Sequence, residues 1–275
     1  MSSVLFDVPG PRSRRRHRVG GVVSSAVLLG LAALVVLKLY REGVFALDQW
    51  EVFVTPVYMV AILKGTLQTL LVGATAILLA VPFGALFGIG RLSDHAWVRW
   101  PCALVVEFFR AVPLLMLILA IFLGWGQEIG TFWSLVIGLT LYNGAVLAEV
   151  FRAGILAVPK GQGEAGYSIG LRKNQVTRFV LLPQAVRIML PAIISQCVVV
   201  VKDTALGFII LAEELASVIK QIFIEFDNII PAAIVAAAIY IAINGTLSAV
   251  AHRVEARTRK AGGTVLESAD PGEFV

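Results

Sequence analysis

The sequence predicts an all-α integral membrane protein with six transmembrane helices. Its 275 residues are 58% hydrophobic and only 15% charged, and the mean hydropathy is +0.86. Soluble domains carry roughly 25% charged residues, so much of this surface is expected to face hydrocarbon. Backbone polar groups in a bilayer core must be paired within their own segment. Each long apolar run is therefore expected to be a helix.

Six runs are long enough, because a spanning helix needs about 20 mostly apolar residues. The first run resembles a secretory signal, but it is too long and no small-residue cleavage site follows it, so we expect an uncleaved anchor. The fifth run is interrupted by Lys202, Asp203 and Thr204. The six runs cover residues 22–39, 67–89, 102–125, 132–150, 188–211 and 229–251.

The distribution of Lys and Arg predicts that both termini are cytoplasmic. Five arginines precede residue 20, and further basic residues fill alternate loops and the tail. The opposite side carries only Lys38, Arg41, Lys64 and Lys220, and the positive-inside rule orients the chain accordingly. The expected organisation is a basic cytoplasmic arm (1–20), a first transmembrane anchor (21–40), an extracytoplasmic connection (41–64), a membrane core (65–255) and a polar cytoplasmic tail (256–275) that is expected to be disordered.

The loop 153–183 carries the most informative pattern of the chain. Its centre reads Glu-Ala-Gly-Tyr-Ser-Ile-Gly over 164–170, and Val-Leu-Leu-Pro follows over 180–183. We expect a short helix over 164–169, with Glu164 in its first turn, where the helix dipole interacts favourably with a carboxylate. Gly161 and Gly163 are expected to form a tight turn before it, and Gly170 to end it, as glycine commonly does.

This spacing resembles the cytoplasmic coupling loop of the membrane subunits of ATP-binding-cassette importers. That loop reads Glu-Ala-Ala, three residues, Gly, nine residues, Ile, one residue and Leu-Pro. Here Gly166 replaces the second alanine and Val180 the isoleucine. The resemblance implies the type I importer permease fold. It also implies that a separate ATPase contacts Glu164, Ala165, Gly166, Ser168 and Gly170.

Further motifs resemble the polar-amino-acid branch of this family, and together they cover roughly residues 65–257. The stretches 108–115, 149–155, 182–187 and 201–206 resemble its FFRG-x-PLL, E-x-FRGGI, LPQA-x-R and LKDTSL motifs. The mild departures are Ala111, Ala153, Val201 and Ala205. The resemblance implies a permease for polar amino acids, with glutamate or glutamine favoured. The implied partners are ATPase subunits, a second permease subunit (identical or related), an extracytoplasmic solute-binding protein, the amino-acid substrate and membrane lipid, in a prokaryotic plasma membrane.

Charged and polar residues inside the apolar runs are candidates for the translocation path. A charge in a span costs about 2.5–3.5 kcal/mol on insertion scales and usually has a function. The candidates are Lys202, Asp203, Thr204 and Asn143. The alternative is that they serve only structure, by pairing with another helix or with a backbone break, and the sequence leaves both interpretations open.

Two pairs of charges three residues apart are expected to form ion pairs on one helix face. They are Glu107 with Arg110 and Glu149 with Arg152. Both pairs are expected to be structural and to lie near the cytoplasmic interface.

Several other functions lack the residues that they need. The sequence contains no phosphate-binding loop, so ATP and Mg²⁺ are expected to bind the partner ATPase and no cofactor to bind this chain. The glycine pattern over 161–166 follows an apolar helix rather than the strand that a dinucleotide site requires. Cys102 and Cys197 have neither disulfide nor metal spacing. We expect no enzyme, no metal site and no nucleic-acid partner. The alternative function is a self-sufficient secondary amino-acid carrier, which would usually need two related halves.

Overall fold

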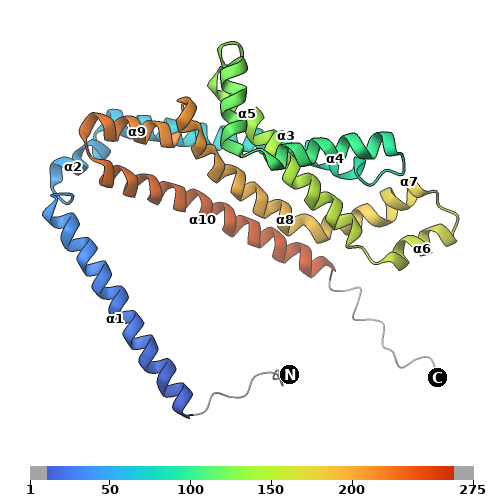
Figure 1. Ribbon diagram of the computed structural model, residues 1–275, viewed down its shortest axis with the longest axis horizontal. Coiled ribbons are helices and arrows are strands. Elements are labelled where there is room, and N and C mark those ends of the chain that lie inside the picture. Colours follow the sequence, from blue (N-terminus) through green and yellow to red (C-terminus); the bar gives the residue numbers. More distant parts are fainter. Residues whose placement is uncertain (1–10, 263–275) are drawn as a thin grey trace. The chain divides into compact units, whose positions relative to one another are not determined.

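The structure is a computed structural model that describes residues 11–262, and within this range it contains only helices and their connections (Figure 1). The chain divides into two compact units, Met1–Thr55 and Pro56–Val275. Unit 1 contains α1 (Pro11–Arg41), α2 (Leu47–Glu51) and the 3₁₀-helix η1 (Val52–Val54). The last residues of the predicted tail, 263–275, and the first ten residues of the predicted arm lie outside the described residues.

Unit 2 contains the remaining helices, listed here in chain order. They are α3 (Pro56–Gly90), α4 (Ala96–Ala111), α5 (Leu114–Leu156), α6 (Lys160–Ser168), α7 (Lys173–Gln175), the π-helix η2 (Val176–Leu181), α8 (Leu182–Asp203), the 3₁₀-helix η3 (Thr204–Ile210), α9 (Leu215–Phe226) and α10 (Ile229–Gly262).

Five helical segments of the described chain are long and apolar enough to cross a membrane. They correspond to the predicted runs, except that the third and fourth fall together in α5. Gly130 has a non-helical conformation (φ 77°, ψ 170°) that divides α5 into two arms. A methyl group on Gly138 would lie 2.7 Å from Ile118, so the two arms double back and pack against each other.

The predicted continuous span over 102–125 is wrong in its first half. Helix α4 ends at Ala111, and Val112 takes an extended conformation (φ −77°, ψ 127°) before Pro113. Proline restricts the preceding residue to such conformations and lacks the N–H group that helix continuation needs. The apolar run of the sequence therefore joins the end of α4 to the first arm of α5.

Close packing between α3 and α5 forms the centre of unit 2. A methyl group on Gly84 would lie 2.6 Å from Leu147, and one on Gly88 would lie 2.5 Å from the Ala148 carbonyl oxygen. Small residues four positions apart allow helix backbones to approach closely in membranes. The glycine pair in the second apolar run therefore has a packing role.

The predicted interruption of the fifth apolar run is present. Helix α8 ends at Asp203, the chain continues as η3 to Ile210, and Leu211 takes a left-handed conformation (φ 54°). Lys202, Asp203 and Thr204 thus lie at the junction of the two helices.

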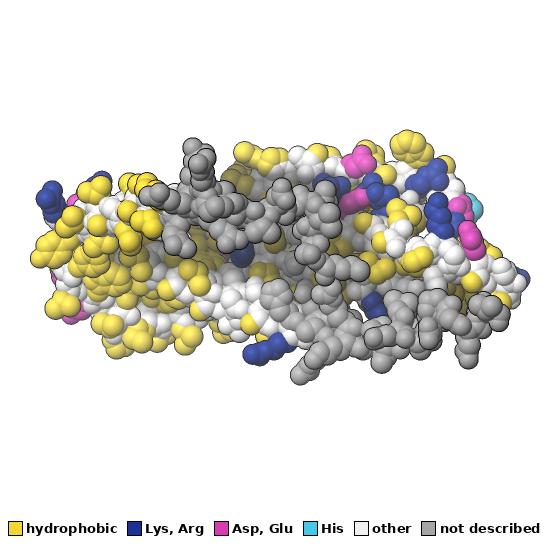
Figure 2. All heavy atoms as spheres, turned by 90° about the horizontal axis from the view of Figure 1, so that it is seen from below, with side chains coloured by type: hydrophobic (Ala, Val, Ile, Leu, Met, Phe, Trp, Pro, Cys, Tyr) yellow, Lys and Arg dark blue, Asp and Glu magenta, His cyan; other side chains and the backbone are white. Residues whose placement is uncertain are grey.

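Apolar side chains cover much of the exterior, as expected for a surface that faces lipid. The described side chains of α1 from Val19 onward are almost all exposed and mostly apolar. Charged side chains gather toward the end of unit 2 that carries α6 and α7 (Figure 2). We call this the α6 end, and the opposite end, where α3 begins and α9 lies, the α9 end (Figure 1).

Candidate functional site

The first candidate site is the segment 160–181, here named the coupling element, which contains α6, α7 and η2. The predicted short helix is present, but it begins at Lys160, directly after Pro159, rather than at Glu164. Proline is well tolerated at a helix start, where its missing N–H would have no helical partner. Gly161 and Gly163 consequently lie inside α6, so the predicted tight turn is wrong. Glu164 also falls beyond the first turn.

Two glycines fix the end of α6. Gly170 has the predicted left-handed conformation (φ 83°), and its N–H donates to the Tyr167 carbonyl oxygen at 2.9 Å. The Leu171 N–H then donates to the Gly166 carbonyl oxygen at 3.2 Å. Gly166 is buried, and a methyl group there would lie 3.0 Å from a Val176 methyl. This tight contact accounts for glycine where the resembled pattern has alanine.

The predicted ATPase contacts are mostly accessible. Glu164, Ala165, Ser168 and Gly170 are exposed, whereas Gly166 is buried beneath them. The Ser168 hydroxyl donates to the Glu164 carbonyl oxygen at 2.9 Å. The element thus presents an ordered outer face, and its contact with an ATPase stays a prediction.

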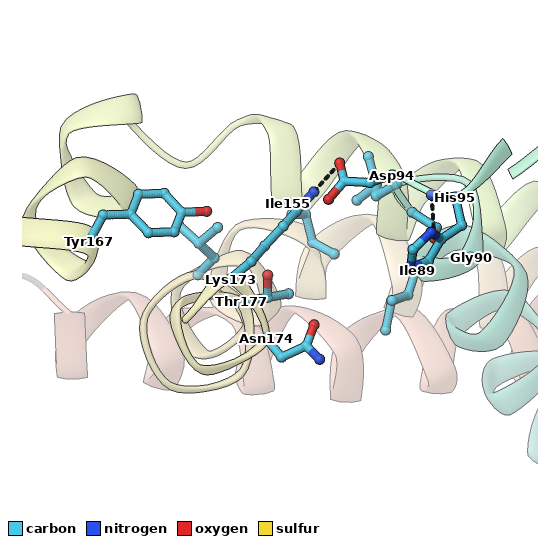
Figure 3. Close-up of a pocket in the computed structure, with 12 residues that line it drawn as sticks. Ile89, Gly90, Asp94, His95, Ile155, Tyr167, Lys173, Asn174 and Thr177 are labelled. Carbon is cyan, nitrogen blue, oxygen red and sulfur yellow. Dashed lines mark hydrogen bonds and ion pairs between the residues drawn. The ribbon is translucent and has the colours of Figure 1, made fainter. Parts of the chain in front are cut away.

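Two polar links attach the coupling element to the rest of unit 2. Lys173 forms an ion pair with Asp94 of the α3–α4 loop (Figure 3). Gln184 of α8 donates to Gln162 of α6 at 3.1 Å. The Lys173 ammonium group, through its hydrogen bond to Asp94, lowers the pKa of that carboxyl.

A cleft of about 380 Å³ lies between the coupling element and the α3–α4 loop. The Asp94–Lys173 ion pair lies at this cleft, with Tyr167 on its α6 side (Figure 3). The ion pair joins the coupling element to the α3–α4 loop at this cleft.

A cluster of charges at the α6 end differs from the sequence prediction. Glu149 accepts hydrogen bonds from Arg91 at 2.7 Å and from Arg152 at 2.6 Å, and Arg110 lies 3.7 Å away. The predicted Glu149–Arg152 pair is confirmed. The predicted Glu107–Arg110 pair is wrong, because Glu107 contacts Arg91 at 3.4 Å instead. We call these five residues the arginine cluster.

Partners from three helical segments explain this outcome. Arg91 follows the end of α3, while α4 and α5 supply the other members. A three-residue spacing permits a pair on one helix, but a carboxylate packed between helices takes whichever guanidinium approaches most closely. No pattern along the chain indicates that the side chain of Arg91 turns inward, where it is only 13% exposed.

The candidates for the translocation path fall into three environments. Asn143 is buried and accepts a hydrogen bond from Gln196 at 2.7 Å, and its side chain also bonds to Asp203. Thr204 is buried and donates to the Val201 carbonyl oxygen at 2.7 Å. Lys202 is exposed. The structure thus joins two of the four candidates in one network, and it adds Gln196, which sequence reasoning missed.

Comparison with protein families identifies the molecule. Residues 80–260 match the family described as the binding-protein-dependent transport system inner membrane component. The chain belongs to this family. The match includes the coupling element, the arginine cluster and the polar network around Asn143.

Curated relatives agree with this assignment. The glutamate transport system permease protein GluD of Corynebacterium glutamicum is 38% identical over 226 residues, which cover 79% of this chain and 82% of that protein. The probable glutamine ABC transporter permease protein GlnP of Bacillus subtilis is 34% identical over 199 residues, covering 70% and 91% respectively.

Solved structures share the fold. A structure titled as the crystal structure of an amino acid ABC transporter with histidines matches with a TM-score of 0.68 and 28% identity, over 73% of this chain and 95% of that chain. An inward-facing structure of the MetNI methionine ABC transporter matches with a TM-score of 0.64, over 74% and 99%. Its 19% identity supports a likeness of fold alone.

These findings confirm the family and fold that the motifs implied. The chain is a permease subunit of an ATP-binding-cassette importer, and it has the all-α type I fold. A self-sufficient secondary carrier is not favoured, since the family belongs to binding-protein-dependent systems.

Proposed function

We propose that this permease forms the translocation path of an importer for polar amino acids, with glutamate and glutamine as the first candidates. The observation that carries the proposal is the agreement between the relatives' names, which specify glutamate and glutamine, and the branch motifs of this sequence. The partly buried network of Asn143, Gln196 and Asp203 supports it, because side chains of this kind can bond polar groups of a solute.

The proposed energy source is a pair of separate ATPase subunits that bind ATP and Mg²⁺. The exposed face of α6 is their proposed contact, while this chain binds no cofactor of its own. The two polar links of the coupling element support this role, because an element attached to α3, through its loop, and to α8 can pass a movement on to the membrane helices.

A second permease subunit, identical or related, is proposed to complete the path. Lys202 is exposed at the end of an apolar helix and would be costly to place against lipid. A paired permease would instead put it beside a hydrated route. An extracytoplasmic solute-binding protein is the proposed source of the amino acid.

The family is an inner membrane component, and several helices can span, so the protein is a multi-pass plasma-membrane protein. We propose that both termini and the coupling element are cytoplasmic. The basic arm and loops support this orientation.

The test is reconstitution in liposomes with the ATPase and the solute-binding protein of the same system. Uptake of labelled L-glutamate or L-glutamine that requires ATP and the binding protein is the expected result. Mass measurement of the intact complex should find two permease chains. ATP-dependent uptake of other solutes only would overturn the amino-acid assignment, and transport by this chain alone would overturn the assembly.

A further inference from the structure

A second cleft opens at the α9 end of unit 2, far from the coupling element. It has a volume of about 440 Å³ and lies between α3 and the segment that leads into α9. Lys64 and Gln68 line it from α3, and Glu213, Ser217 and Gln221 line it from the other side. Residues 64 and 90 of α3 are about 39 Å apart along the helix at about 1.5 Å per residue. We call this the outer cleft.

A buried hydrogen-bond network holds the walls of the outer cleft in place. Glu214 is fully buried, and it accepts bonds from the Ser217 N–H at 2.8 Å and the Tyr240 hydroxyl at 3.1 Å. The Leu215 N–H donates to the Thr69 hydroxyl at 3.1 Å, which ties α9 to α3. These bonds fix the start of α9 against both α3 and α10.

Gly65 explains how closely the two walls approach. A methyl group at this position would lie 2.9 Å from Val218 and 3.2 Å from the backbone of Leu215. The width of the cleft is therefore fixed by the packing of α3 against α9. Binding sites for small ligands are usually preformed in this way.

Two charged side chains that line the outer cleft have no bonding partner among the described residues. Within residues 11–262, Lys64 and Glu213 take part in no ion pair or hydrogen bond, although both are exposed on its lining. Gln68 and Gln221 add two carboxamides that are likewise free within that range. The carboxylate of Glu214, by contrast, caps α9 by accepting hydrogen bonds from its first backbone N–H groups.

Lys64 and Gln68 lie four residues apart on one face of α3, near the start of a 35-residue helix. At about 1.5 Å per residue this helix is about 52 Å long, which exceeds the roughly 30 Å hydrocarbon core. Because Lys64 also belongs to the expected extracytoplasmic connection, this face is expected to border water. A water-filled cleft with one cationic and one anionic wall suits a ligand that carries both charges on neighbouring atoms.

We propose that the outer cleft binds the zwitterionic backbone of an α-amino acid at the entrance of the path. Lys64 receives the α-carboxylate, Glu213 receives the α-ammonium group, and Gln68 and Gln221 face the polar side chain. The inference rests on the proposed function in one respect, that the transported solute is an amino acid. It adds a recognition site on the membrane subunit itself.

The test measures binding of labelled L-glutamine to the purified permease–ATPase complex in lipid nanodiscs, without the solute-binding protein. Loss of one charge-assisted contact should weaken binding about tenfold or more in Lys64→Gln and in Glu213→Gln. The exposed carboxylate variant Glu128→Gln and the exposed lysine variant Lys38→Gln serve as matched controls and should bind normally. Elution of each complex at the wild-type position shows that the variants assemble.

Two analogues assign each charge. L-Glutamine with its α-carboxylate converted to an amide already lacks the partner of Lys64, so Lys64→Gln should weaken its binding no further. N-Acetyl-L-glutamine should be equally insensitive to Glu213→Gln. The assignment is wrong if Lys64→Gln weakens binding of the amide analogue, or Glu213→Gln weakens binding of N-acetyl-L-glutamine, as much as it weakens binding of L-glutamine.

Other outcomes separate this inference from the proposed function. The proposed amino-acid site in the outer cleft is wrong if the wild type shows no saturable binding, or if both charge variants bind as well as the wild type. Neither result contradicts amino-acid uptake by the reconstituted importer. If the variants weaken docking of the solute-binding protein but not binding of L-glutamine, the cleft is a docking surface and the proposal is wrong. If the variants change L-glutamine binding but the importer takes up no amino acid, the proposed function fails instead.

Discussion

Gly170 is the residue on which the end of α6 depends most directly, because its φ of 83° is strained for any other L-residue. A side chain in this region costs about 1–2 kcal/mol, and a β-branched one costs more. We predict that Gly170→Val reorients α6 and lowers the amount of amino acid taken up per ATP hydrolysed several-fold. The ratio of the two rates in proteoliposomes measures the effect.

Gly124→Val is the matched control for this change. Gly124 has no neighbouring atom within 4 Å of an added methyl group and has no positive φ. It lies in the first arm of α5, away from the coupling element, so coupling should stay normal. Full transport by Gly170→Val would show that the geometry of this turn is not needed for coupling.

Glu149 is the common partner of three guanidinium groups in the arginine cluster. We predict that Glu149→Gln destabilises the complex by about 2 kcal/mol, since it removes charge-assisted bonds from the largely buried Arg91. The midpoint of thermal unfolding in nanodiscs should fall clearly. Glu107→Gln is the control, because its side chain is 68% exposed and its contact is 3.4 Å, and it should cost less than about 1 kcal/mol. An equal loss of stability in Glu149→Gln and Glu107→Gln would contradict the prediction that Glu149 contributes more.

Asp203 lies where the two sequence interpretations can be separated. If it lines the translocation path, Asp203→Asn should assemble normally while the uptake rate or the preference between glutamate and glutamine changes. If its bond with Asn143 is purely structural, the variant should fail to accumulate as a complex, because the buried Asn143 would lose its charged partner. Wild-type uptake with unchanged preference would remove Asp203 from the path.

At the scale of elements, the Asp94–Lys173 ion pair links the α3–α4 loop to the coupling element. We predict that Lys173→Asp separates them by charge repulsion and lowers uptake per ATP, and that adding Asp94→Lys restores it. Hydrogen exchange of the backbone amides of residues 160–181 should become faster in the single variant and return to the wild-type rate in the double variant. Failure of the second change to rescue either measurement would show that the pair does not transmit movement.

The pH dependence of this link follows from the direction of the Asp94 shift. Its pKa in the folded protein lies below the ordinary value, which is about 4. The contribution of the pair is therefore fully present above pH 4 and is lost as the pH falls through the lowered pKa. Exchange over 160–181 should not respond to the state of Asp94 between pH 5 and pH 8.

The sequence predicted the elements that depend on local chemistry. The apolar runs, the end of α6 at Gly170 and the interruption after Lys202 are all readable from residue type, because hydrocarbon, left-handed turns and buried charge each restrict the choice sharply. The break at Pro113 was missed, since the apolar run continues without change on both sides of it.

Features that depend on packing between elements could not be predicted. The choice of Arg91 over Arg110 as the contact of Glu107, the bond between Gln196 and Asn143, and the outer cleft all join residues far apart in the chain. Spacing along one helix carries no information on which neighbouring helix approaches. The start of α6 was also missed, because Gly161 and Gly163 favour turns but do not forbid a helix.

At the scale of the whole molecule, the course of α5 determines the topology. Its first arm, residues 114–129, would be about 24 Å long, which is shorter than the roughly 30 Å hydrocarbon core. If each arm crosses the membrane, the bend at Gly130 lies outside, and α1, α3, α8 and α10 complete an even number of crossings. If the arms instead form a re-entrant hairpin, the bend stays within the membrane.

Cysteine labelling in intact cells distinguishes these arrangements. We predict that a cysteine at Gln127, in a protein without Cys102 and Cys197, reacts with a membrane-impermeant maleimide from outside, because two crossings place the bend there. A cysteine at Gly163 should react only after the membrane is permeabilised, since the coupling element must face the cytoplasmic ATPase. Protection of Gln127 with protection of Gly163 would identify a re-entrant hairpin and reduce the number of crossings to four. Reaction of Gly163 from outside would invert the whole topology and separate the coupling element from its proposed partner.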